Sequence, residues 1–305
     1  MLIAILNILI LFIVPFIVLG IIKKTKAFWA GRKGVNILQP LWDFVKLMKK
    51  EVIYSKTTSC VFKLAPVIGF SSIIFASLFV PLATGKPIIS TPFAFIVFAY
   101  VLALGKFFSI ISALDTGSSF EGMGASREAC FSTIVEPAFF IMMASIIALS
   151  QNYSFGALKL ILSNAGVYGC LIIVLSIITL FIMLLVEGCR VPVDDPTTHL
   201  ELTMIHEVMI LDNSGPNLGL ITWGSAIKMF LFQALIANLI IPQGLNDWVS
   251  ILLFLLIIIF ISLVIGTVES AFARFRMTHV FEFIFIMTIT SLLILSLVAY
   301  RLYGN

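Results

Sequence analysis

A single polar stretch holds most of the residues in this chain that could do chemistry. Residues 187–215, EGCRVPVDDPTTHLELTMIHEVMILDNSG, contain six carboxylates, two of the three histidines and one basic residue, Arg190. Carboxylates and histidines exchange protons, and both bind metal ions. The stretch therefore has the residue types for proton transfer, for a metal site or for recognition of a charged partner.

The spacing within this stretch favours histidines that relay protons or hydrogen-bond to a partner over a metal site. His199 and His206 are seven residues apart, unlike the HExxH motif, in which two histidines one helical turn apart bind zinc. Asp195 and Pro196 predict a helix start, because aspartate caps helix N-termini and proline is favoured at the first helical position. We therefore expect a short helix over about 196–210. One stripe of that helix would carry His199, Thr203, His206 and Glu207.

The sequence contains no motif for nucleophilic or cofactor chemistry. No GxSxG, no glycine-rich phosphate loop and no CxxC pair occurs. Iron–sulfur and zinc sites need closely spaced cysteine sets, and the four cysteines are far apart. We expect no catalytic residue, no metal and no cofactor bound by this chain. We also expect four buried structural cysteines, Cys60, Cys130, Cys170 and Cys189.

The elements that must position the polar stretch are membrane spans. Of the 305 residues, 61% are hydrophobic and 11% are charged, whereas soluble domains contain about 25% charged residues. A transmembrane helix needs about 20 apolar residues, and unbroken runs such as ILLFLLIIIFISLVIG exclude the alternating strands of a β-barrel. We predict one all-α integral membrane domain over 1–305 with eight spans. They cover about 2–22, 61–82, 92–113, 128–150, 167–188, 218–241, 249–270 and 279–302.

The distribution of basic residues predicts the orientation of these spans. The connections after the odd-numbered spans, with the adjoining Lys63, carry 14 Lys and Arg, and the other side carries three. Since cytoplasmic loops are enriched in Lys and Arg, we expect both termini outside the cytoplasmic membrane of a prokaryote. Ten basic residues lie within 23–63, where they would meet anionic membrane lipid. The net charge of +4 therefore does not indicate a nucleic-acid partner.

Two more of the cytoplasmic connections are unusual. In the first, residues 41–50 place apolar and lysine side chains on opposite faces at helical spacing, which predicts an amphipathic interfacial helix after the first span. The second, DTGSSFEGMGASREA (115–129), contains three glycines, which allow tight turns, and Ser126 as an expected cap of the fourth span. We interpret 115–129 as a long loop that docks a partner protein or borders a cavity entrance.

Ionisable residues inside the predicted spans are further candidates. A charge at the centre of a membrane costs about 3 kcal/mol or more and usually marks function. Glu136 and Lys228 lie deep in their spans, while Lys106, Glu187 and Glu269 lie nearer the span ends. Such residues would line a hydrated path for protons or sodium ions, and the alternative is a set of ion pairs that holds the helices together. The predicted ion-pathway residues are Glu136, Glu187, Asp194, Asp195, Glu201, His206, Glu207 and Lys228.

Longer motifs give the chain a resemblance to a known superfamily over essentially its whole length. GRKGVNILQPLWDFVKLMKKE (31–51), VFKLAP (61–66), GASREA (124–129) and ARFRM (273–277) are similar to the membrane "heel" subunit, the subunit-1 type, of complex I and energy-converting [NiFe] hydrogenases. Residues 190–216 resemble the hydrogenase branch, the group of hydrogenase-4 component C and formate hydrogenlyase subunit 4. In complex I the corresponding loop borders the quinone chamber, and the TTH and MIHEVMILD segments here depart from it.

This resemblance implies a membrane-anchor and ion-coupling subunit. Its partners would be [NiFe]-hydrogenase large and small subunits, a polyferredoxin-like iron–sulfur subunit and antiporter-like membrane subunits, with the [NiFe] centre and iron–sulfur clusters in those partners. Two alternatives stay open: the quinone-site subunit of a complex I-like NADH or ferredoxin:quinone oxidoreductase, and a freestanding secondary ion transporter. The predicted arm-docking residues are Arg32, Asp43, Asp115, Glu121, Arg127, Glu128, Arg190, Arg274 and Arg276.

Overall fold

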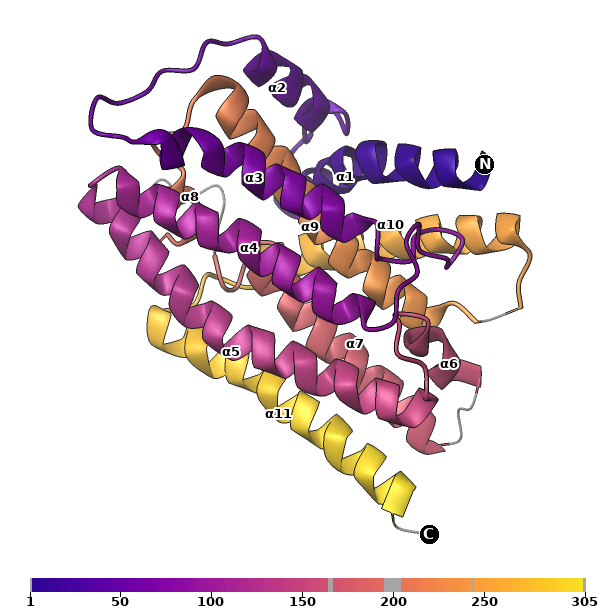
Figure 1. The fold of residues 1–305 in the computed structure, drawn as a ribbon. Helices are drawn as coiled ribbons and strands as arrows, with labels where there is room; N and C mark the ends of the chain where they lie inside the picture. Colours follow the sequence, from indigo (N-terminus) through magenta and orange to yellow (C-terminus); the bar gives the residue numbers. More distant parts are fainter. Residues whose placement is uncertain (1, 164–166, 195–203, 243, 304–305) are drawn as a thin grey trace.

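The computed structural model describes residues 2–163, 167–194, 204–242 and 244–303, and within these ranges it contains helices and no strand (Figure 1). Eight of the helices are long and apolar enough to cross a membrane. They are α1 (Leu2–Trp29), α3 (Cys60–Ser77), α4 (Ala94–Asp115), α5 (Ser119–Ser150), α7 (Val167–Glu187), α9 (Gly215–Ile240), α10 (Asp247–Ala271) and α11 (Met277–Tyr303). Shorter helices lie in the connections: α2 (Gln39–Met48), α6 (Ala157–Ser163) and α8 (His206–Met209).

The predicted all-α fold with eight spans is confirmed, with one large difference in extent. Helix α5 begins at Ser119 rather than near 128, so only residues 116–118 connect it to α4. Gly117 makes this turn with a φ of 71°, whereas Ser126 lies inside α5 and caps nothing. The prediction of a long loop over 115–129 is therefore wrong.

The role of Gly124 explains the error. Gly124 is buried in α5, and a Cβ at this position would lie 2.7 Å from the Ile205 carbonyl oxygen and 2.9 Å from Met209 Cγ. Glycine is required here because the backbone before α8 approaches α5 closely, not because the chain turns.

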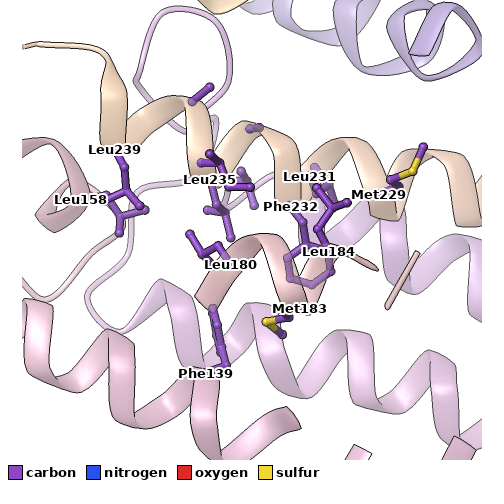
Figure 2. Close-up of a cluster of buried hydrophobic side chains, with 14 of the residues drawn as sticks. Phe139, Leu158, Leu180, Met183, Leu184, Met229, Leu231, Phe232, Leu235 and Leu239 are labelled. Carbon is purple, nitrogen blue, oxygen red and sulfur yellow. The ribbon is translucent and has the colours of Figure 1, made fainter. Parts of the chain in front are cut away.

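Helix α9 is the centre of the bundle. It contacts α1, α2, α3, α6, α7 and α10. Of its most apolar 18 residues 67% are buried, a larger share than in any other span. Figure 2 shows Leu231 and Leu235 of α9 facing Leu180 and Leu184 of α7. Helix association in lipid depends on such close packing, since lipid chains are as apolar as leucine.

The predicted interfacial helix forms as α2 and is held by aromatic packing. The Trp223 ring of α9 lies 4.7 Å from the Phe44 ring of α2, measured between centroids, 5.6 Å from Phe16 of α1 and 5.0 Å from Phe70 of α3. The Phe44 ring also lies 5.6 Å from the Phe16 ring, so aromatic contacts fix α2 against α9 and α1. Its position relative to the lipid surface stays a prediction.

Both ends of the chain lie at the end of the bundle opposite α8 (Figure 1). The connection between α7 and α9 therefore lies at the far end from the termini. Within the described residues of this connection there is one helical turn, α8, which begins at His206. Met204 and Ile205 before it are not helical, so a continuous helix over 196–210 is not formed. Residues 195–203, which include Asp195, His199 and Glu201, lie outside the described residues.

The central packing of α9 generates a stability prediction. Phe230 is fully buried and lies edge-to-face against Phe254 of α10, with 6.1 Å between ring centroids. We expect Phe230→Ala to destabilise the protein in detergent by up to about 3 kcal/mol, because the substitution leaves a cavity in the bundle. The loss is smaller than in a water-soluble protein, since moving a phenyl ring from the core to a lipid-like solvent costs little. Thermal unfolding measures this, with the 65% exposed Phe260→Ala as the matched control. Equal loss in both variants would contradict a packed α9 core.

Candidate functional site

Glu187, at the end of α7, lies between two lysines. Lys106 Nζ of α4 is 2.6 Å from Glu187 Oε1, and Lys228 Nζ of α9 is 3.2 Å from Glu187 Oε2. The Glu187 side chain is 6% exposed. A buried carboxylate is costly unless it is paired and hydrogen-bonded. Here each oxygen has its own ammonium group, and one side chain joins three spans.

Helix α5 brings two more carboxylates to this cluster. Glu128 Oε1 is 3.7 Å from Lys106 Nζ, and Glu136 lies eight residues further along α5, about 12 Å along the helix axis. The ammonium groups of Lys106 and Lys228 thus face three carboxylates from two other helices. We call Lys106, Glu128, Glu136, Glu187 and Lys228 the charge cluster.

Two cavities adjoin the charge cluster and meet at Lys106. The first holds about 790 Å³ of empty space, including its open part, between α3, α4, α5, α8 and α9, and its polar wall includes Glu128, His206 and Lys228. The second holds about 350 Å³ and is lined by Glu136 and Glu187 with aromatic side chains. Lys106 and Leu102 line both cavities.

The connection from α7 to α9 is anchored where it begins. Asp194, 1% exposed, accepts hydrogen bonds at Oδ2 from the backbone N–H groups of Ile205, at 3.2 Å, and His206, at 3.0 Å. Its Oδ1 lies 3.0 Å from Arg274 Nη2 in the connection between α10 and α11. One carboxylate thus closes the base of the connection and ties α8 to the segment between the last two spans.

A second ion pair reinforces this base. Arg190 Nη1 is 3.3 Å from Glu269 Oε1 at the end of α10, and Lys26 Nζ of α1 is 3.0 Å from Glu269 Oε2. The backbone N–H of Phe275 also donates to the Pro192 carbonyl oxygen at 3.0 Å. The start of the connection is therefore fixed to α1 and α10.

The part of the connection that follows is fixed to α5 and to the segment before α3. Arg127 Nη1 donates to the Met204 carbonyl oxygen at 2.8 Å, and Glu121 Oε1, buried, accepts from the Asp212 N–H at 3.1 Å. The Ser214 hydroxyl exchanges hydrogen bonds with the backbone of Ile53, accepting at 3.0 Å and donating at 3.3 Å. These contacts hold α8 against the first cavity.

Burial changes the proton affinity of two α8 residues. Burial, and then the nearby Lys228 ammonium, lower the pKa of His206, so this imidazole is neutral at pH 7. Burial, and then the Asp194 carboxylate, raise the pKa of Glu207. A neutral histidine beside a lysine can donate and accept a proton, which suits a relay along the cavity wall.

The structure describes six of the eight predicted ion-pathway residues, and all six lie in or beside the charge cluster and α8. Glu136, Glu187 and Lys228 lie in the charge cluster, and His206 lines the first cavity with Lys228. Asp194 holds the backbone of His206. Glu207 follows in α8. Asp195 and Glu201 lie outside the described residues.

Most predicted docking residues make contacts within the chain. Asp115 Oδ2 accepts from the Ser59 N–H at 2.8 Å, at the start of α3, and Asp43 accepts from Gln39 at 2.9 Å. Arg32 and Arg276 are exposed, so they are open to a partner. The remaining residues, Glu121, Arg127, Glu128, Arg190 and Arg274, take part in the contacts described above.

Sequence reasoning left Lys106 and Glu269 outside the predicted site. The sequence shows that both residues lie near span ends. It does not show their ion-pair partners, because these come from helices distant in sequence. The cysteine prediction is wrong at three positions: only Cys189 is buried, while Cys60, Cys130 and Cys170 are exposed in the isolated chain. A small apolar side chain is as well suited to a lipid-facing surface as to a core. Among the described residues no group of His, Cys, Asp and Glu has the arrangement of a metal site.

The fold and the buried charges define a polytopic membrane subunit, and comparison with known proteins gives its family. The family model of NADH dehydrogenase matches residues 1–300. The chain therefore belongs to the NADH dehydrogenase family.

Several characterised proteins are similar to this chain. Formate hydrogenlyase subunit 4 of Escherichia coli (strain K12) is 28% identical over 279 residues, covering 88% of this chain and 89% of that protein. Hydrogenase-4 component C of the same organism is 31% identical over 232 residues, covering 74% and 70%. NADH-ubiquinone oxidoreductase chain 1 of Petunia hybrida is 27% identical, covering 76% and 69%.

A solved structure shares the fold. A chain in the structure of the membrane-bound sulfane sulfur reductase, an archaeal respiratory membrane complex, superposes with a TM-score of 0.80 at 20% identity, covering 97% of this chain and 98% of that chain. At this identity the likeness shows the fold alone.

The anchoring of α8 predicts the effect of a substitution at Asp194. Asp194→Asn removes the ion pair with Arg274 and weakens two charge-assisted hydrogen bonds, which we expect to cost about 1–3 kcal/mol. The connection should then be cleaved faster in limited proteolysis while the spans remain intact. Asp247→Asn, at an exposed position in the first turn of α10, is the control. Unchanged cleavage in Asp194→Asn would show that Asp194 does not anchor α8.

The pKa of His206 predicts a pH dependence. Because the folded pKa is below the unfolded value, the unfolded chain binds more protons, and stability falls as the pH decreases from about 6.5 toward the folded pKa, by at most about 1.4 kcal/mol per pH unit. His206→Gln should lose less thermal stability than the natural protein between pH 7.5 and 5.5. His279→Gln, in an exposed pair with Glu282, should behave like the natural protein. The opposite ranking would contradict a buried neutral His206.

Proposed function

We propose that this chain is the membrane-anchor and ion-coupling subunit of a group 4 energy-converting [NiFe] hydrogenase complex in the cytoplasmic membrane of a prokaryote. The observation that carries the proposal is one arrangement: the charge cluster and α8 share the wall of the first cavity. The connection that would face a cytoplasmic arm thus adjoins the buried charges that would face an ion path. Similarity to the hydrogenase components supports the choice of complex.

A small movement of the connection would change the charge cluster appreciably. Lys228 and Glu187 are 3.2 Å apart. With an effective dielectric constant of about 20, separating such a pair to about 8 Å changes its energy by roughly 3 kcal/mol, or about 100-fold in a proton equilibrium. Displacement of α8 by the arm would alter the same cavity wall. Electron transfer in the arm would therefore be linked to proton or sodium uptake through Glu187.

The electron-transfer chemistry itself belongs to partner subunits in this proposal. The [NiFe]-hydrogenase large and small subunits and a polyferredoxin-like iron–sulfur subunit would carry the [NiFe] centre and the iron–sulfur clusters. Exposed Arg32 and Arg276 would contact this arm, and antiporter-like subunits would pack beside the spans. Both termini would lie outside the cytoplasm, since the basic connections mark the cytoplasmic side. Purification of the complex and identification of its subunits tests this set of partners.

One observation favours a second candidate, a quinone-site subunit. The first cavity combines polar side chains with apolar ones from α3 and α9, such as Phe70 and Ile221, and amphiphiles bind in cavities of this kind. The Petunia hybrida relative is named as a chain of an NADH-ubiquinone oxidoreductase. Quinone extracted from the purified complex at stoichiometric amounts would favour this candidate over the hydrogenase complex.

Substitution of Glu187 tests the coupling function. Glu187→Gln removes the negative charge between Lys106 and Lys228 but keeps the shape, so we expect ion uptake per hydrogen evolved to fall at least about 10-fold in membrane vesicles. Co-purification of the partner subunits checks assembly. Glu282→Gln, at an exposed position, is the matched control and should retain coupling. Full coupling in Glu187→Gln, with the complex assembled, would refute the assignment.

A further inference from the structure

We infer that the ion carried past the charge cluster is a proton rather than a sodium ion, and that Lys106 is the residue that hands it from the first cavity to the second. This inference rests on the proposed coupling function and goes beyond it by naming the ion and the gate. It is carried by the position of Lys106, which lines both cavities.

Lys106 separates two differently charged spaces. On the first-cavity side its Nζ has Glu128 at 3.7 Å, with His206 and Lys228 in the same wall. On the second-cavity side lie Glu136 and Glu187, and Glu187 Oε1 is 2.6 Å from the ammonium nitrogen. Within the described part of the chain, the only other residue that lines both cavities is Leu102, which cannot carry charge.

The geometry is unfavourable for a sodium ion. Hard metal cations are held by several oxygen ligands at once. Both Glu187 oxygens are already occupied by ammonium groups, at 2.6 and 3.2 Å, so neither oxygen is free to bind a sodium ion.

A proton crosses the same geometry by transfer between side chains. The Lys106 ammonium gives one proton to the Glu187 carboxylate, 2.6 Å away, and becomes a neutral amine. Glu187 then passes this proton to the Glu136 carboxylate, which lines the same second cavity. A proton that enters from the first cavity by way of Glu128 then passes to this amine, which restores the ammonium. The net result is one proton moved from the first cavity, by way of Glu128, to Glu136, with no other atom or electron displaced. Glu187 also positions Lys106, since its Oε1 holds the ammonium nitrogen at 2.6 Å.

Replacing Lys106 with arginine distinguishes proton transfer by Lys106 from a role as an ion-pair partner only. Arginine keeps the positive charge and the bond to Glu187, but it does not release its proton. We expect Lys106→Arg to assemble, to evolve hydrogen and to lose at least about 10-fold of the proton uptake per hydrogen evolved. Lys106→Met, which cannot carry a proton, should lose the same. Lys26→Arg is the matched control, because Lys26 pairs with Glu269 outside both cavities.

The experiment uses membrane vesicles that contain the whole complex, supplied with formate or reduced ferredoxin, whichever sustains hydrogen evolution. Acidification of the vesicle interior is followed in sodium-free medium, and ²²Na⁺ uptake is followed in parallel with a protonophore present. Proton uptake without sodium, lost in Lys106→Arg and kept in Lys26→Arg, is the expected result.

Three outcomes would overturn the inference. Proton uptake at the natural level in Lys106→Arg would reduce Lys106 to an ion-pair partner while leaving the coupling function intact. Protonophore-resistant ²²Na⁺ uptake by the natural complex would also leave coupling intact but would name sodium as the ion. No gradient of either ion in the natural complex, despite hydrogen evolution, would remove the proposed function itself.

Discussion

The structure depends on one buried carboxylate held by two lysines. Glu187 lies at the end of α7, and its ammonium partners come from α4 and α9, the latter being the helix around which the bundle packs. Removing Glu187 would take away the carboxylate that both ammonium groups share and leave positive charge in a poorly solvated place. This requirement fixes how the three helices approach each other, and it places Lys106 at the boundary of two cavities. The other two acids lie on opposite sides of that boundary: Glu128 lines the first cavity and Glu136 lines the second.

The connection from α7 to α9 starts immediately after Glu187, so covalent structure already joins it to the charge cluster. Asp194, Arg190 and Glu121 then hold it to three different parts of the bundle. The connection is therefore held at several points, and α8 lies in the wall of the first cavity. A force applied to this segment by a partner would reach the charge cluster over a short distance, through packed side chains and ion pairs.

Much of the fold could be predicted from the sequence, because apolar runs of sufficient length leave few alternatives to helices. The positions of Glu136, Glu187 and Lys228 were equally visible. The start of α5 was not, because glycine serves both turns and close approaches, and only the backbone before α8 shows which use applies at Gly124. Lys106 was noticed as a charge, but its pairing with Glu187, 81 positions away, depends on how α4 and α7 pack. Asp115 was predicted to dock a partner, but within the chain its carboxylate accepts a hydrogen bond from the Ser59 N–H at the start of α3.

The central claim is that chemistry in a partner arm changes the protonation of the charge cluster. Infrared difference spectroscopy of the purified complex, recorded between oxidised and reduced states, tests this claim most directly. The account predicts a carboxyl protonation band that appears on reduction and is lost in Glu187→Gln or Glu136→Gln. A complex that translocates ions fully without such a band, or with a band unchanged in both variants, would contradict the account.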